Sequence, residues 1–271
     1  MFGLSATLRH FVFGSPPHTR NIVKRGTSRK EATAGHAIFR RGATSEEIAI
    51  HAMVNSKHAV SFSDASIVAR QFSCLHVLGS AVIMMDTWLL HDSHTAEHVE
   101  RMTAGLEGGF PEAEQAIVKS VPPAVFIGYQ EGISVFSFGR FVCNELYVDR
   151  ILLGSDYEPV FEKYLKEYQQ MIFENWQNKN AATYTGAGPV FSEEAFEAFI
   201  KLNVDFYTKV NQLHSQKLKN IVEVDENGNE KETNITERYN IKEVEIALRK
   251  LFGNLKSLES ENKLSPVHRL K

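Results

Sequence analysis

The pattern of apolar and polar positions differs between the two ends of the chain. Before Pro159, short apolar runs and period-2 alternation predict strands. After Pro159, apolar residues recur every three or four positions, which predicts amphipathic helices. The chain is therefore expected to combine a sheet with a helical region, an α+β arrangement. The predicted strands cover residues 37–41, 58–64, 77–90, 124–127, 133–138 and 141–153.

Helical spacing and turn residues predict the remaining elements. A tight turn at 128–132, with a glycine at each end, is expected to join two of the strands. A hairpin or loop tip is expected at 225–229. The predicted helices cover residues 45–55, 65–72, 94–102, 112–119, 161–176, a stretch that starts near 192, and 244–258.

Composition and charge narrow the class of protein. Hydrophobic residues make up 43% and charged residues 23% of the chain, which is typical of a soluble globular protein. A net charge of −3 argues against nucleic acid as the main partner, because phosphate neutralisation needs a basic surface. The best apolar run, residues 81–90, is too short for a membrane span and contains Asp86. Two cysteines, Cys74 and Cys143, are no disulfide framework and favour a reducing compartment.

Residues 1–30 contain basic residues but no Asp or Glu. Such a composition is typical of organelle transit peptides, and it also fits a loose basic arm or a lead-in helix. The arm is favoured, because Pro16-Pro17 would break a long amphipathic helix. The expected organisation is a basic segment at 1–30, a catalytic domain at 31–160 and a helical region at 161–271.

Two short motifs in the first half of the chain suggest a chemistry. An apolar run at 37–39 stops abruptly at residues 40–42, which read Arg-Arg-Gly. Residues 60–63 read Val-Ser-Phe-Ser, so the two hydroxyls are expected on one face of a half-buried strand. Helical spacing follows from residue 65, so the strand is expected to lead directly into a helix.

These motifs resemble the first two signatures of the arginine–serine–glutamate class of ADP-ribosyltransferases, which includes cholera-like and actin-modifying binary toxins. Phe39-Arg40-Arg41 is similar to the first signature and Ser61-Phe62-Ser63 to the second, and the likeness covers roughly a third to a half of the chain. The resemblance implies a mixed or antiparallel transferase sheet, NAD as the substrate and no metal. It also implies a toxin or effector that acts in the cytoplasm or is secreted into a target cell.

The resemblance implies a role for each motif residue. Arg40 would hold the NAD pyrophosphate with its planar guanidinium, and Arg41 would add a phosphate contact. The Ser61 hydroxyl would keep a catalytic carboxylate aimed at the ribose. The expected NAD-binding residues are Arg40, Arg41, Gly42, Ser61, Phe62 and Ser63.

The third signature is a glutamate close to a strand late in the catalytic domain. Glu145, within residues 141–150, is similar to that element and is the expected catalytic carboxylate; Glu131 in the predicted turn is its competitor. Arginine-modifying members usually carry Glu or Gln two residues earlier, where this chain has Cys143. An arginine acceptor is therefore not assumed.

A rival motif lies at His94, Glu97 and His98, which fit the H-x-x-E-H pattern of zinc peptidases. On a helix this spacing puts two imidazoles on one face beside a glutamate base, and Glu167 or Glu174 would be the third ligand. The predicted helix lacks the apolar framing of a buried zinc site, which favours an exposed polar helix.

The sequence thus predicts a mono-ADP-ribosyltransferase that cleaves the nicotinamide–ribose bond of NAD and transfers ADP-ribose to a protein acceptor. Its expected catalytic residues are Glu145, Ser61 and Arg40. Two alternatives stay open: the zinc metallopeptidase, and a non-enzymatic interaction protein on a degenerate transferase fold.

Overall fold

The computed structural model spans the whole chain and describes part of it in detail. The described residues are 22–29, 32, 60–63, 69–70, 73, 80–92, 96–100, 113–117, 119–131, 139–149, 155–177, 192–219, 223–224, 230–231 and 237–264.

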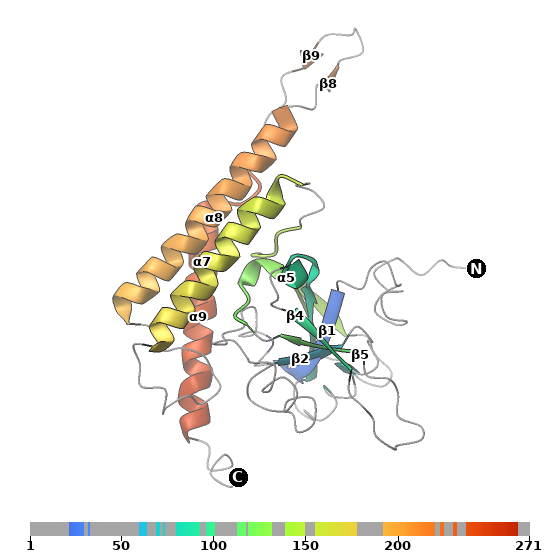
Figure 1. Ribbon diagram of the computed structural model, residues 1–271, viewed down its shortest axis with the longest axis vertical. Coiled ribbons are helices and arrows are strands. Elements are labelled where there is room, and N and C mark those ends of the chain that lie inside the picture. Colours follow the sequence, from blue (N-terminus) through green and yellow to red (C-terminus); the bar gives the residue numbers. More distant parts are fainter. Residues whose placement is uncertain are drawn as a thin grey trace, which may run out of the picture.

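The described strands form one seven-stranded antiparallel sheet in the order β4-β5-β2-β1-β3-β6-β7 (Figure 1). A separate two-stranded hairpin, β8–β9, projects from the helical region. The α+β class predicted from the sequence is confirmed at this level. The strands are β1 (Ile22–Ser28), β2 (Val60–Ser63), β3 (Ser80–Asp86), β4 (Ala96–Glu100), β5 (Ala113–Ile117), β6 (Phe126–Glu131), β7 (Arg140–Cys143), β8 (Glu223–Val224) and β9 (Glu230–Lys231).

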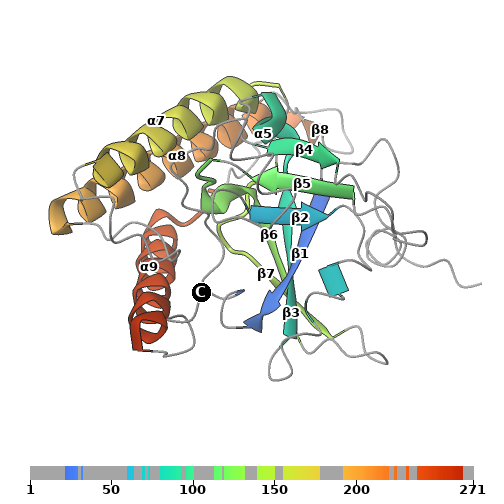
Figure 2. The same ribbon diagram turned by 60° about the horizontal axis from the view of Figure 1, so that its bottom comes forward.

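The seven-stranded sheet consists of two parts that meet at one point. Strands β1 and β3 pair along their full length, whereas β1 and β2 share a single register pair, Lys24 opposite Ser63. Figure 2 shows β2, β4 and β5 lying crosswise to β1 and β3. The two parts of the sheet are therefore joined at Lys24 and Ser63.

Strand β3 lies in the middle of the larger part and is covered on both faces. All five interior residues, Ala81–Met85, are buried. On one face, Ile83 and Met85 belong to the main apolar core, and on the other Val82 packs against Ala69. A strand buried on both faces reads as a continuous apolar run, which is why the sequence predicted this element.

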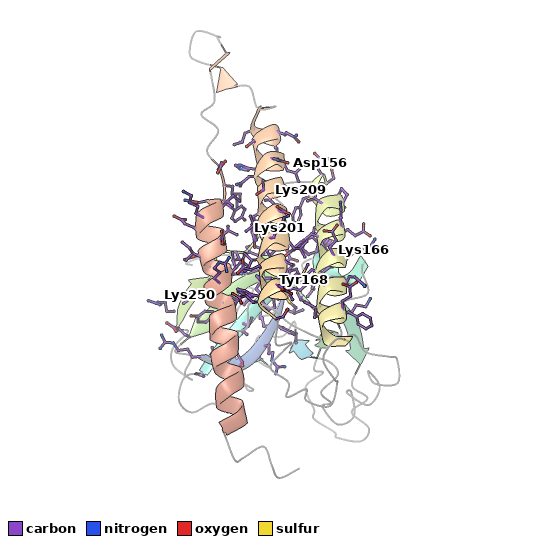
Figure 3. The ribbon with its side chains drawn as sticks, turned by 90° about the vertical axis from the view of Figure 1, so that its left-hand side faces the viewer. Asp156, Lys166, Tyr168, Lys201, Lys209 and Lys250 are labelled. Carbon is purple, nitrogen blue, oxygen red and sulfur yellow. The ribbon has the colours of Figure 1, made fainter. Side chains whose placement is uncertain are left out.

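Three long helices, α7 (Tyr157–Gln177), α8 (Glu193–Lys219) and α9 (Ile241–Leu264), form a bundle beside the sheet (Figures 1 and 2). A short helix, α5 (Trp88–Asp92), follows β3, and a 3-10 turn, η2 (Pro123–Val125), precedes β6. In Figure 3, Tyr168 lies between α7 and α8, whereas Lys166 and Lys250 lie on the outer flanks. Within the described part of the chain, no helix combines the length and apolarity needed to cross a membrane.

Aromatic side chains fill the interface between α7 and α8. Phe206 stacks on Tyr164 with ring centroids 3.9 Å apart and planes 9° from parallel. The rings of Tyr168 and Phe199 pack beside this pair, with their centroids 5.0 Å apart. Burial raises the pKa of the Tyr164 and Tyr168 hydroxyls well above the usual value, so both stay neutral.

The bundle is attached to the sheet through residues 144–149, which follow β7. The Tyr207 hydroxyl donates to the carbonyl of Leu146, and the Tyr239 hydroxyl donates to the carbonyl of Tyr147 at 2.7 Å. Asn211 holds Tyr239 in place by bonding both its backbone N–H and its carbonyl. The apolar faces of the helices are thus buried within this chain, in one core with the sheet.

The long helices and the hairpin confirm the sequence predictions for the C-terminal region, because α7, α8 and α9 span the predicted ranges and β8 pairs with β9. Five other predictions are wrong. The strand expected at 141–153 ends at Cys143, and residues 144–149 are not in a strand. Residues 94–102 and 112–119 were expected to be helical, but they contain β4 and β5. The predicted turn at 128–132 is largely β6. Residues 22–28, expected in a basic arm or lead-in helix, form β1 in the interior of the sheet.

Gly128 allows β6 and β7 to pair closely. Its φ is +152°, and a Cβ atom there would collide with the carbonyl oxygen of Val142 and lie 3.0 Å from the Phe141 ring. We expect Gly128→Ala to lower the free energy of unfolding by about 2–4 kcal/mol, because backbone must shift on both strands. Gly253→Ala in α9 is the matched control: no atom lies within 4 Å of the added methyl, and a gain of about 0.5–1 kcal/mol is expected. Equal effects of the two changes in urea unfolding would contradict this account.

Candidate functional site

The serine motif lies on β2, beside β5. Antiparallel pairing puts Ser63 directly opposite Glu114 and Ser61 directly opposite Ala116. Directly opposite residues share a face of the sheet, and their Cβ atoms are about 4.5–5.5 Å apart. Ser63 is thus the direct neighbour of position 114 on β5, and Ser61 is its diagonal neighbour.

A lysine on β1 lies on the other side of β2 from position 114. Lys24 of β1 is directly opposite Ser63, so positions 24, 63 and 114 form a row across three adjacent strands. Both residues are buried: Lys24 is 0% exposed and Ser63 is 5% exposed. A cation, a hydroxyl and an acidic position therefore meet at the junction between the two parts of the sheet.

Phe62 belongs to the core and not to the polar row. Its side chain is 3% exposed and packs in the main apolar cluster. Since successive strand residues point to opposite faces, Phe62 faces away from Ser63. Phe62 therefore anchors β2 in the apolar core, and its expected contact with NAD stays a prediction from the sequence.

The sheet order does not bring Glu145 to the serine motif. Strands β1, β3 and β6 lie between β2 and β7, and Glu145 follows the end of β7. With adjacent strands about 4.8 Å apart, β1 and β7 alone are separated by about 14 Å. A hydroxyl–carboxylate hydrogen bond needs about 2.5–3.0 Å. Glu145 is exposed, in a segment where neighbouring Asn144 donates to the carbonyls of Pro123 and Phe126 at 2.9 and 2.7 Å.

Glu131, the competitor, is engaged in ion pairs at the opposite end of β6. Its carboxylate lies 2.7 Å from Arg29 Nε and 3.3 Å from Arg140 Nη2, and its side chain is only 13% exposed. Burial and the Glu131 charge raise the pKa of neighbouring Tyr129, although the two arginines act in the other direction. Glu131 is thus a strand residue in a charge cluster and not a turn residue as the sequence predicted.

Arg40, Arg41 and Gly42 lie outside the described residues, so the structure does not place the predicted phosphate anchor. Their assignment stays a prediction from the sequence. The same holds for Glu112, two positions before Glu114.

The zinc motif does not form on a helix. Glu97 and His98 lie on β4, where consecutive residues occupy opposite faces, and His94 lies outside the described residues. The pattern needs a helix to align its two imidazoles, so the peptidase interpretation loses its geometric basis. In the part of the chain that the structure describes, no three His, Cys, Asp or Glu side chains are grouped to hold a metal ion.

Glu114 is not among the candidate carboxylates that the sequence pattern indicated. Residues 112–114 read Glu-Ala-Glu, the spacing that arginine-modifying transferases carry at their third signature. A helix over residues 112–119, which the local sequence predicts, would not place Glu114 beside β2. The register of β2 and β5 reveals the relation.

Comparisons of this chain with protein-family models, with curated proteins and with solved structures find no match.

Proposed function

We propose that this protein is a mono-ADP-ribosyltransferase whose catalytic carboxylate is Glu114. The observation that carries the proposal is the register of β2 and β5, which puts Ser63 directly opposite Glu114. The serine signature and Glu114 are thereby neighbours in the sheet. Glu145 does not have this relation to the serine motif.

The chemistry requires a negative charge beside the ribose of NAD. When the bond between the ribose C1′ and the nicotinamide nitrogen breaks, its electron pair stays on the nitrogen and neutralises the pyridinium. The ribose develops oxocarbenium character, which a fixed carboxylate stabilises. A lone pair of the acceptor, or of water, then forms the new bond to C1′, and the acceptor proton leaves to solvent. Glu114 supplies the carboxylate in this scheme, and Ser63 and Ser61 supply hydroxyls that orient it.

The reassignment also changes the acceptor question. With Glu145 as the catalytic residue, the acceptor-orienting position would be Cys143, an exposed thiol at the end of β7. With Glu114 it is Glu112, a carboxylate that is able to receive a hydrogen bond from a guanidinium. The proposal therefore includes arginine among the candidate acceptor residues of a partner protein.

The test uses the purified full chain, NAD labelled in its adenylate phosphate, and a cell lysate as the source of acceptors. Transfer gives a labelled protein band, and hydrolysis without lysate gives free nicotinamide. We expect at least nicotinamide release from the wild type. Absence of NAD binding and of both products would refute the transferase and favour the non-enzymatic interaction protein.

Arg40 gives a separate prediction for the phosphate anchor. Lysine lacks the planar fork that binds two phosphate oxygens together, so Arg40→Lys is expected to weaken NAD binding by about tenfold. Arg41→Lys is the matched change and is expected to do less. Isothermal titration with NAD measures both, and negligible effects at the two positions would remove the anchor.

A further inference from the structure

A lysine is buried in the interior of the sheet. Lys24 lies in the middle of β1 with no exposed surface. Lysine is almost never fully buried unless its charge is compensated, because removal of an ammonium group from water is costly. Its neighbours along the strand are ordinary: Val23 is core, and Arg25 lies on the opposite face, level with Ile83. Burial at this one position therefore calls for a role.

The position of Lys24 is defined by two ladder partners, one on each neighbouring strand. It is level with Met84 on β3 and with Ser63 on β2, and Ser63 is level with Glu114 on β5. Lysine has a four-carbon stem, so its ammonium spans the roughly 5 Å to a directly opposite serine. The single β1–β2 register pair is also the point where the two parts of the sheet join. A positive charge at this point therefore acts electrostatically on the residue opposite Ser63, which is Glu114.

We propose that Lys24 is a positioning residue for the Glu114 carboxylate and acts through Ser63. In this arrangement the ammonium donates a hydrogen bond to the Ser63 oxygen, and the Ser63 hydroxyl donates to Glu114. The Ser63 proton is thereby directed toward the carboxylate, and the nearby positive charge favours the ionised form. This inference deepens the proposed function and rests on its choice of Glu114.

Few other charged positions share this face of the sheet in the described strands. Glu97 of β4 is level with Ala116 and is therefore a diagonal neighbour of Glu114. Asp86 ends β3, and Arg70 follows Ala69, which packs on Val82. Glu97 would oppose ionisation of Glu114 and Arg70 would favour it, but neither is in the row. Lys24 is the cation closest in register to Glu114.

The proposal is tested by the ionisation of Glu114 in the protein without NAD, so that the result does not depend on turnover. Glutamate labelled with ¹³C at the side-chain carboxyl is titrated by NMR, and the Glu114 signal is assigned by its loss in Glu114→Gln. We expect Lys24→Met to raise the pKa of Glu114, with at least a tenfold change in its acid dissociation constant. Lys24→Arg is expected to restore most of the difference, because the charge is kept. An unchanged Glu114 titration in folded Lys24→Met would overturn the proposal.

Two further variants separate a positioning role from a structural one. Arg25→Met removes the adjacent cation on the opposite face and is expected to leave the Glu114 titration unchanged. Ser63→Ala cuts the link, so it is expected to raise the pKa of Glu114 even if Lys24→Met does not fold. If folded Ser63→Ala leaves the titration unchanged, or if Arg25→Met moves it as far as Lys24→Met does, the row does not act as proposed. NAD cleavage by the wild type is measured separately: a shifted titration without cleavage would refute the transferase and leave the Lys24 row standing.

Discussion

Glu114→Gln is expected to lower kcat for nicotinamide release by about 10²–10³ while NAD affinity stays nearly unchanged. Glutamine keeps the shape of the side chain but carries no charge, so it does not stabilise an oxocarbenium-like ribose. The loss is confined to the transition state, because ground-state NAD carries no full positive charge on the ribose carbon. Initial rates across a range of NAD concentrations, together with binding by titration calorimetry, separate the two parameters.

The control for this prediction is Glu145→Gln, the same chemical change at the carboxylate expected from the sequence. Glu145 is exposed and separated from β2 by three strands, so the variant is expected to keep kcat within about twofold of the wild type. If instead Glu145→Gln loses activity and Glu114→Gln retains it, the catalytic carboxylate lies after β7. That result would also refute the reassignment of the acceptor-orienting residue to Glu112.

The C-terminal region was predictable because its pattern is long and unambiguous. Helix α8 carries Phe199, Phe206 and Val210 at helical spacing, and all three are buried. An apolar stripe of this length fits the helical period of about 3.6 residues and not the strand period of two. The buried strand β3 was also predictable, because a short continuous apolar run flanked by polar residues is typical of a strand that is buried on both faces.

Strands β4 and β5 were not predictable, because their residues prefer the helix. Strand β5 reads Ala-Glu-Gln-Ala-Ile, and Ala, Glu and Gln are among the best helix formers. Local preference is overridden here by pairing with β2 on one side and β4 on the other. Such pairing depends on residues about 50 positions earlier in the chain, which no local window contains.

The distance between Glu145 and the serine motif could not be predicted for the same reason. A glutamate near the end of a strand satisfies a sequence pattern wherever that strand lies in the sheet. Which strand neighbours β2 is a property of topology, and β5 takes that place. Once β5 was interpreted as a helix, Glu114 was removed from the set of strand residues that could face Ser63.

Phe206→Ala is expected to lower the free energy of unfolding by about 3–5 kcal/mol, the range for loss of a large buried aromatic side chain. Phe206 is 3% exposed and stacks on Tyr164. It also meets Phe161 and Tyr207 edge-on, with ring centroids 6.2 and 5.3 Å apart. Phe173→Ala is the matched change on α7: that ring is 40% exposed, and a cost below about 1 kcal/mol is expected. Urea unfolding followed by far-UV circular dichroism compares the two, and similar costs would contradict the assigned core.

The same variant tests whether the helices and the sheet unfold as one unit. The main core runs without a break from Val23 on β1 to Leu251 on α9, and the Tyr207 and Tyr239 hydroxyls bond the backbone that follows β7. A shared core predicts one cooperative transition, so Phe206→Ala should reduce the hydrogen-exchange protection of β3 amides as much as that of α8 amides. If the β3 amides keep wild-type protection while α8 loses it, the bundle unfolds alone and the predicted boundary near residue 160 separates two units. Loss of protection in both regions would mean that a helix substitution far from β2 also destabilises the row of Lys24, Ser63 and Glu114. Activity measurements on bundle variants must then be made well below their unfolding midpoints.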